Sequence, residues 1–229
     1  MKQLALDIGL APLPSLDNFD ASGNEEALKH LAMWAAHTSR SPVPTYLWGE
    51  PGSGKTHLLG GLRGALASQG LHVGWLDAGV LQPISFQEGW DAVVLDDCHL
   101  YTAEQQACAF NWFVNALSPA NGQVRGVFAA GLVPPADLRL RDDLRTRLGW
   151  GHVFQLHVIG EGQRRAVLRR AADERGLMLT DDVMDFMLSR FARDLSSLMQ
   201  LLAHLDQYAM RTKRALTVPL IKAMLEASD

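Results

Sequence analysis

The chain has 229 residues, of which 48% are hydrophobic and 20% charged, and its formal net charge at pH 7 is -4. This length suffices for a substantial core in one large domain, or in a medium domain with a small appendage. The acidic balance argues against a protein that coats nucleic acid non-specifically, although it leaves room for a local basic patch. No apolar run is long enough for a membrane span and the N-terminus lacks a signal-peptide pattern, so we expect a cytoplasmic protein with no membrane partner.

Strand and helix patterns alternate through the first two thirds of the chain. Residues 1–15, which include two prolines, predict a flexible arm, and the apolar spacing of 24–37 predicts a helix. The predicted strands are 46–48, 72–76, 92–95, 126–130 and 153–156, and the helices between them are 56–68, 103–117 and 137–147. Such alternation predicts an α/β fold with a mostly parallel sheet and helices on both faces.

The last third of the chain carries only helical patterns. These cover 161–175, 181–191, 194–212 and 219–227. We therefore expect three parts: an arm at 1–15, a nucleotide-binding α/β domain at 16–158 and a small helical lid domain at 159–229.

A phosphate-binding loop occupies the junction between the first predicted strand and the helix that follows it. Its sequence is Gly49-Glu50-Pro51-Gly52-Ser53-Gly54-Lys55-Thr56, with the spacing G-x-x-x-x-G-K-[ST]. Glycines let successive backbone N–H groups surround phosphates, Lys55 reaches the outer phosphates, and the Thr56 hydroxyl binds Mg²⁺. A glycine-rich turn without a nucleotide is the alternative, and the flanking strand and helix argue against it. The residues expected to bind ADP or ATP are Gly49, Pro51, Gly52, Ser53, Gly54, Lys55 and Thr56.

Two carboxylates end the apolar strand 92–95, about 40 residues after the phosphate loop. Asp96 is expected to hold Mg²⁺ together with Thr56, and Asp97 to orient an attacking water as a catalytic residue. The alternative is a pair of solvated aspartates at the end of a buried strand.

These motifs and three further segments resemble the DnaA branch of the AAA+ P-loop ATPases, and within it the short Hda proteins. The segments are Leu16-Asp17-Asn18-Phe19, Leu144-Arg145-Thr146-Arg147-Leu148-Gly149-Trp150-Gly151 and Val218-Pro219-Leu220-Ile221-Lys222. The resemblance implies an AAA+ sheet flanked by helices with a helical lid. It also implies that Phe19 lies by the adenine and that Arg147 is an arginine finger that acts in trans.

The resemblance implies two protein partners, DnaA and the β sliding clamp of DNA polymerase. Arg147 would complete the site around ATP bound to DnaA, unless it belongs to a solvated arginine cluster that also contacts DNA phosphates weakly. The arm segment Gln3-Leu4-Ala5-Leu6-Asp7-Ile8 resembles a clamp-binding motif. In it Gln3 would form hydrogen bonds and Leu4, Leu6 and Ile8 would be apolar anchors; a strand edge or a disordered tail is the alternative.

Two positions depart from the family pattern. Leu132 and Val133 stand where a polar sensor residue is expected, and Ser196 stands where the sensor-2 arginine is expected, with Arg193 about one helical turn away. We therefore expect tight binding of ADP or ATP with Mg²⁺ but slow intrinsic hydrolysis.

The function that these features favour is negative regulation of DNA replication initiation. A nucleotide-bound protein, tethered to the clamp, would stimulate hydrolysis of ATP on DnaA. The chain stops at Asp229 without a helix-turn-helix pattern after the lid, so we expect DNA contact to be weak or indirect. A self-contained AAA+ ATPase or DnaC-like helicase loader, a plain nucleotide-binding scaffold and a homo-oligomer all remain open at this point.

Overall fold

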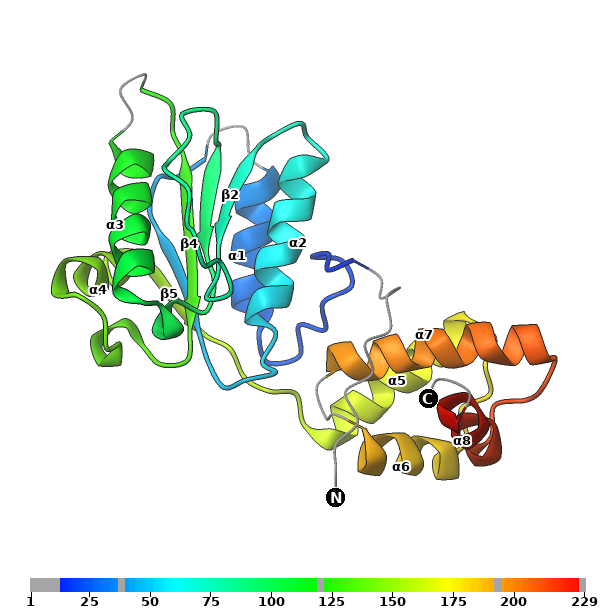
Figure 1. The fold of residues 1–229 in the computed structure, drawn as a ribbon. Coiled ribbons are helices and arrows are strands. Elements are labelled where there is room, and N and C mark those ends of the chain that lie inside the picture. Colours follow the sequence, from blue (N-terminus) through cyan, green and yellow to red (C-terminus); the bar gives the residue numbers. More distant parts are fainter. Residues whose placement is uncertain (1–12, 37–39, 119–121, 192–194, 227–229) are drawn as a thin grey trace. The chain divides into compact units, whose positions relative to one another are not determined.

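A computed structural model describes residues 13–36, 40–118, 122–191 and 195–226, except for the side chains of residues 196 and 226. It contains two compact units, one spanning Leu13–Val158 and the other beginning at Ile159. The first is a sheet between two layers of helices, and the second is a group of packed helices (Figure 1).

The first unit is built on a five-stranded sheet in the order β2-β3-β4-β1-β5. The strands are β1 (Thr45–Trp48), β2 (Val73–Leu76), β3 (Ala92–Leu95), β4 (Gly126–Gly131) and β5 (His152–Gln155). All four pairings are parallel, which confirms the predicted sheet. Because β1 lies between β4 and β5, the loop after β1 leaves the sheet where the strand order changes direction, a common ligand position in such folds.

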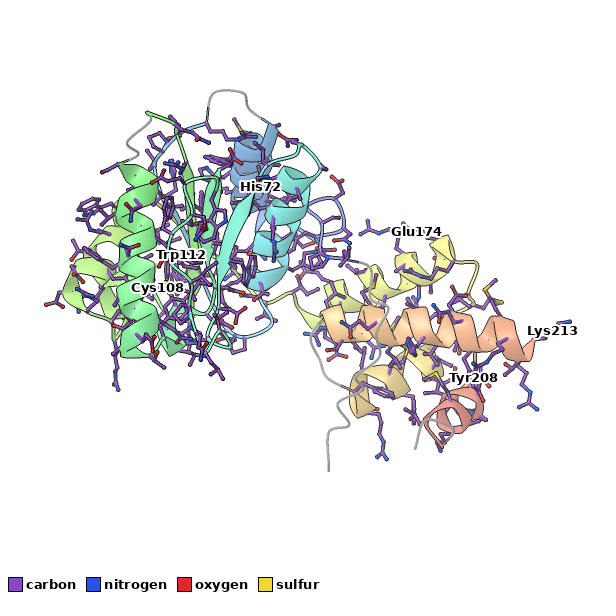
Figure 2. The ribbon with its side chains drawn as sticks, turned by 45° about the horizontal axis from the view of Figure 1, so that its top comes forward. His72, Cys108, Trp112, Glu174, Tyr208 and Lys213 are labelled. Carbon is purple, nitrogen blue, oxygen red and sulfur yellow. The ribbon has the colours of Figure 1, made fainter. Side chains whose placement is uncertain are left out.

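Helices cover both faces of this sheet (Figure 1). One face packs against α1 (Glu25–Ala36) and α2 (Lys55–Ala67), the other against α3 (Ala103–Leu117) and α4 (Asp142–Leu148). The alternation of side chains along a strand decides which core each joins: Val94 packs on the α1 and α2 side, and Val93 on the α3 side. Trp112 of α3 is 1% exposed and lies between that helix and the sheet (Figure 2).

The structure differs from the helix predicted over 137–147. A short 3-10 helix, η2, covers Pro135–Asp137, and α4 begins only at Asp142. Between them Leu138 and Leu140 are buried, whereas Arg139 and Arg141 are exposed. This period of two is that of extended backbone, so burial of both leucines in one core delays the start of the helix.

The second unit consists of four helices around their own core. They are α5 (Glu161–Glu174), α6 (Asp181–Arg190), α7 (Leu195–Thr212) and α8 (Val218–Glu226). Leu168, Met184, Leu202 and Ile221 are all fully buried in one cluster, and Tyr208 of α7 packs against it (Figure 2). No helix within the described ranges is both long and apolar enough to cross a membrane.

A buried arginine joins the loop before β3 to the start of β4. The Arg125 side chain is 0% exposed; its Nε donates to the Trp90 carbonyl at 2.9 Å and its Nη2 to the Glu88 carbonyl at 2.7 Å. Nη2 also pairs with the Glu88 carboxylate at 2.8 Å, although that side chain is 67% exposed. The guanidinium therefore fixes a loop chiefly through backbone acceptors.

We predict that Arg125→Ala lowers the free energy of unfolding by about 3 kcal/mol, because it leaves buried carbonyls without a donor and opens a cavity. Glu88→Gln, which removes only the exposed half of the ion pair, should cost less than about 1 kcal/mol. Urea denaturation of both variants tests this contrast; equal losses would show that the ion pair, and not the backbone bonds, dominates.

Candidate functional site

Glycine backbone shapes the loop between β1 and α2. Gly52 and Gly54 have φ values of 79° and 94°, in the left-handed region that favours glycine. A Cβ on Gly54 would lie 2.5 Å from Cε2 of Phe19, so no other residue fits without displacing that ring. The loop therefore meets the conformational demand of a phosphate-binding loop, with the N-terminus of α2 directly behind it.

Lys55 is the first residue of α2 and is only 7% exposed. Its Nζ donates to the Gly49 carbonyl at 2.8 Å and to the Glu50 carbonyl at 3.0 Å. Burial lowers the pKa of this ammonium, whereas the nearby Asp97 and Asp96 carboxylates act to raise it. The loop thus encloses a cation at the point where the motif predicts phosphate binding.

Asp96 and Thr56, the two residues expected to hold Mg²⁺, have side chains that lie close together. Asp96 is 2% exposed as a residue, and its carboxylate forms a hydrogen bond with the Thr56 side chain and accepts another from the Asp97 backbone N–H at 3.0 Å. Burial raises the pKa of Asp96, and the Thr56 hydrogen bond opposes that shift. These hard oxygen atoms fit Mg²⁺, which commonly takes one or two protein ligands beside nucleotide phosphates and water.

Within the described ranges, no group of three or more His, Cys, Asp or Glu side chains could hold a metal ion. A Mg²⁺ ion at Thr56 and Asp96 would therefore take its remaining ligands from phosphate and water. The residues present therefore fit a metal ion that binds together with a nucleotide better than a metal ion held by protein ligands alone.

Asp97 adopts an unusual backbone conformation, with φ 47° and ψ 37°. A non-glycine residue there costs on the order of 1 kcal/mol, and such strain gathers at functional sites. The short helix η1 (Cys98–Leu100) holds the turn, since the Leu100 N–H donates to the Asp97 carbonyl at 2.9 Å. Nearby, His99 has a buried Nδ1 without a hydrogen-bond partner among the described residues, and burial lowers its pKa.

The segment Leu16-Asp17-Asn18-Phe19 lies beside the phosphate loop. Phe19 is half-buried against Gly54, and its ring centroid lies 5.7 Å from that of His57 in α2. His57 Nε2 is 2.7 Å from Asn18 Oδ1 and 3.2 Å from the Ser15 carbonyl. His57 therefore anchors this segment. Its position directly after the phosphate-loop motif is the only sequence signal that could have indicated this role.

Arg147 lies at the end of α4 and stacks against two aromatic rings. Its Cζ is 4.8 Å from the ring centroid of Trp150 and 5.2 Å from that of Phe110 in α3. Two neighbouring arginines pair with carboxylates, Arg141 with Asp143 and Arg145 with Asp142. Within the part of the chain that the structure describes, the Arg147 guanidinium has no ion pair or hydrogen bond, so its charge is not neutralised.

The Arg147 segment enters β5 at the opposite end of the strands from the phosphate loop. Gly151, just before β5, is packed so tightly that a Cβ there would lie 1.9 Å from the carbonyl oxygen of Pro44, just before β1. The phosphate loop instead follows the last residue of β1, Trp48. Because the two segments lie at opposite ends of the strands, and Arg147 lies against aromatic rings at its own end, Arg147 does not contact the phosphate loop of its own chain.

The remaining predicted residues are those of the two sensor positions and of the N-terminal arm. Leu132, directly after β4, is 38% exposed and supplies no polar group at the expected sensor position. Ser196 lies in α7, but its side chain is outside the description, as is all of Arg193. The predicted clamp-binding residues Gln3, Leu4, Leu6 and Ile8 also lie outside the described residues.

Comparison with known proteins agrees with this architecture. The family model for the lid domain of Hda matches residues 161–225, which span α5 to α8 except for the last residue of α8. An uncharacterized protein of Haemophilus influenzae is 31% identical over 234 residues, an alignment that covers 98% of each chain.

Solved structures of DnaA and of the RuvB branch migration motor share the fold. Domain III of Thermotoga maritima DnaA has a TM-score of 0.70 and 22% identity over 94% of this chain and 98% of that one. AMPPCP-bound DnaA from Aquifex aeolicus has a TM-score of 0.66 and 18% identity, covering 90% of this chain and 71% of that one. The Thermotoga maritima RuvB motor follows with a TM-score of 0.61 and 17% identity, over 93% and 72%. With the lid match and the full-length relative, the chain belongs to the Hda-like, DnaA-related AAA+ proteins.

Proposed function

We propose that this DnaA-related regulator restrains replication initiation by stimulating hydrolysis of ATP bound to DnaA. Arg147 would act in trans as the arginine finger, and the β sliding clamp would hold the protein through its N-terminal arm. The observation that carries this proposal is the Arg147 guanidinium, which has no carboxylate partner among the described residues and makes no contact with the phosphate loop of its own chain.

The chemistry of phosphoryl transfer explains why such a group matters. Negative charge spreads over the γ-phosphoryl oxygens in the transition state, and an arginine finger that stabilises it contributes about 10³ to 10⁵ in rate. Arg141 and Arg145 are partly neutralised by Asp143 and Asp142. Arg147 retains its full charge and its planar set of donors for a phosphate on a partner.

The protein's own nucleotide, ADP or ATP with Mg²⁺, would be bound by Lys55, Thr56 and Asp96, with Phe19 beside the loop. A similar fold, that of Aquifex aeolicus DnaA, is known bound to AMPPCP. When bound, the nucleotide would supply phosphate oxygens to complete the coordination of Mg²⁺. Asp97 would orient water, but an apolar Leu132 at the sensor position favours slow intrinsic turnover.

We further propose that Gln3, Leu4, Leu6 and Ile8 bind the β sliding clamp, that DNA contact is weak or indirect, and that the protein acts in the cytoplasm, where it could also form homo-oligomers. An alternative function is a self-contained ATPase or DnaC-like helicase loader. A polar sensor residue after β4 would favour that alternative, whereas the chain has the apolar Leu132 at that position. Rapid intrinsic hydrolysis, without DnaA, would support it.

Replacing Lys55 tests nucleotide binding. Lys55→Ala removes the buried ammonium and should weaken ADP binding by about 10- to 100-fold, the equivalent of about 1.5–3 kcal/mol for a hydrogen bond to a charged group. Isothermal titration calorimetry with Mg²⁺ and ADP measures this. Lys29→Ala, at an exposed position on α1, is the matched control and should bind as wild type; unchanged affinity in Lys55→Ala would exclude the phosphate-binding role.

Replacing Arg147 tests the finger. In a mixture of ATP-loaded DnaA, clamp and DNA, Arg147→Ala should reduce the stimulated rate of ATP hydrolysis by about 10³-fold or to the unstimulated level. Arg139→Ala removes an exposed arginine of the same segment and should leave stimulation within about twofold. If both variants stimulate equally well, Arg147 is not the finger.

Deleting residues 3–8 tests the arm. Because an extended peptide of this kind binds through a few apolar anchors, the deletion should abolish clamp binding in surface plasmon resonance and leave ADP binding unchanged. It should remove stimulation of hydrolysis only where the clamp is required. Retained clamp binding after the deletion would contradict the assignment.

A further inference from the structure

The turn that follows α4 places an aromatic ring against Arg147. The backbone N–H of Trp150 donates to the Arg147 carbonyl at 3.1 Å, and the backbone N–H of Gly149 donates to the Thr146 carbonyl at 3.2 Å. These bonds close the end of the helix and bring the indole within 4.8 Å of the Arg147 Cζ. The neighbouring Gly151 packs against Pro44 and so joins the turn to the sheet.

Trp150 is held by its backbone while its ring stays in solvent. The residue is 57% exposed, which is unusual for a tryptophan, a type that is highly buried on average. The ring therefore adds little to the core. Its specific contact is with a guanidinium, and such a cation–π pair is attractive both at exposed and at desolvated sites.

Stacking orients an arginine without consuming its donors. A carboxylate partner, such as Asp143 for Arg141, accepts N–H bonds and offsets the charge. An aromatic face instead contacts the plane of the guanidinium, so the N–H groups at its edge stay available for phosphate oxygens. Phe110 supplies a second ring, 5.2 Å from the same Cζ.

We propose that Trp150 is a positioning residue for Arg147: its ring holds the guanidinium in one orientation, charged and with free donors, before the partner's nucleotide arrives. This inference rests on the proposed function of Arg147 as a finger. Removing the ring leaves the finger able to react but increases the number of orientations it samples, so the maximal rate falls while binding of the partner persists.

The first experiment observes the stack directly and does not depend on DnaA. In spectra of protein with ¹⁵N-labelled arginine, the Arg147 Nε–Hε signal, identified by its loss in Arg147→Lys, should show a ring-current shift. Trp150→Ala should move that signal toward the position of an exposed arginine, whereas Trp150→Phe should largely retain it. A signal that does not move in Trp150→Ala overturns the proposal.

The second experiment measures hydrolysis of DnaA-bound ATP as the concentration of this protein rises. Trp150→Ala should lower the maximal rate about five- to tenfold with an unchanged half-saturating concentration, and Trp150→Phe should restore most of it. A change confined to the half-saturating concentration would make Trp150 a docking residue and overturn the positioning role. Arg147→Ala separates the two hypotheses: full activity in that variant refutes the finger, whereas its loss beside full activity of Trp150→Ala refutes only the positioning.

Discussion

The burial of the Lys55 ammonium is the constraint on which the phosphate-loop edge of the sheet depends. Desolvation disfavours the charged form, so the cation needs compensating partners. The Gly49 and Glu50 carbonyls provide them directly, and Asp96 and Asp97 act at longer range. The sheet order makes this arrangement accessible, because the ends of β1 and β3 bring the loop and the two carboxylates to the same edge.

Two cationic side chains, Lys55 and Arg147, lie in opposite environments. Lys55 is enclosed by its own loop, where phosphate would replace or join the carbonyl acceptors, and is thus suited to retaining a ligand. Arg147 lies at the end of a short helix, stacked on rings and not neutralised within the described residues. The proposed function requires this second arrangement, because an arginine finger whose charge is neutralised stabilises no developing charge.

The sequence predicted most elements because their patterns are local. Strand β3 and helix α3 have the predicted limits, and the spacing of Lys55, Thr56 and Asp96 predicted their grouping. The segment 138–141 was predicted wrongly as helix, since only the folded core shows that Leu138 and Leu140 are buried together. The stack of Phe110 on Arg147 joins residues 37 positions apart, so no local pattern indicates it.

The departures from the family pattern fit a protein that would retain its own nucleotide and act on the nucleotide of a partner. A sensor residue uses a polar side-chain group to contact the γ-phosphoryl group, and the apolar side chain of Leu132 has no polar group. The strained turn at Asp97 is held by η1. The phosphate loop and the two carboxylates can therefore form a rigid site for a nucleotide. Slow intrinsic turnover would then keep one nucleotide in place through many encounters with a partner. A finger that is oriented before each encounter, by stacking and not by ion pairing, would complement a nucleotide site that changes little.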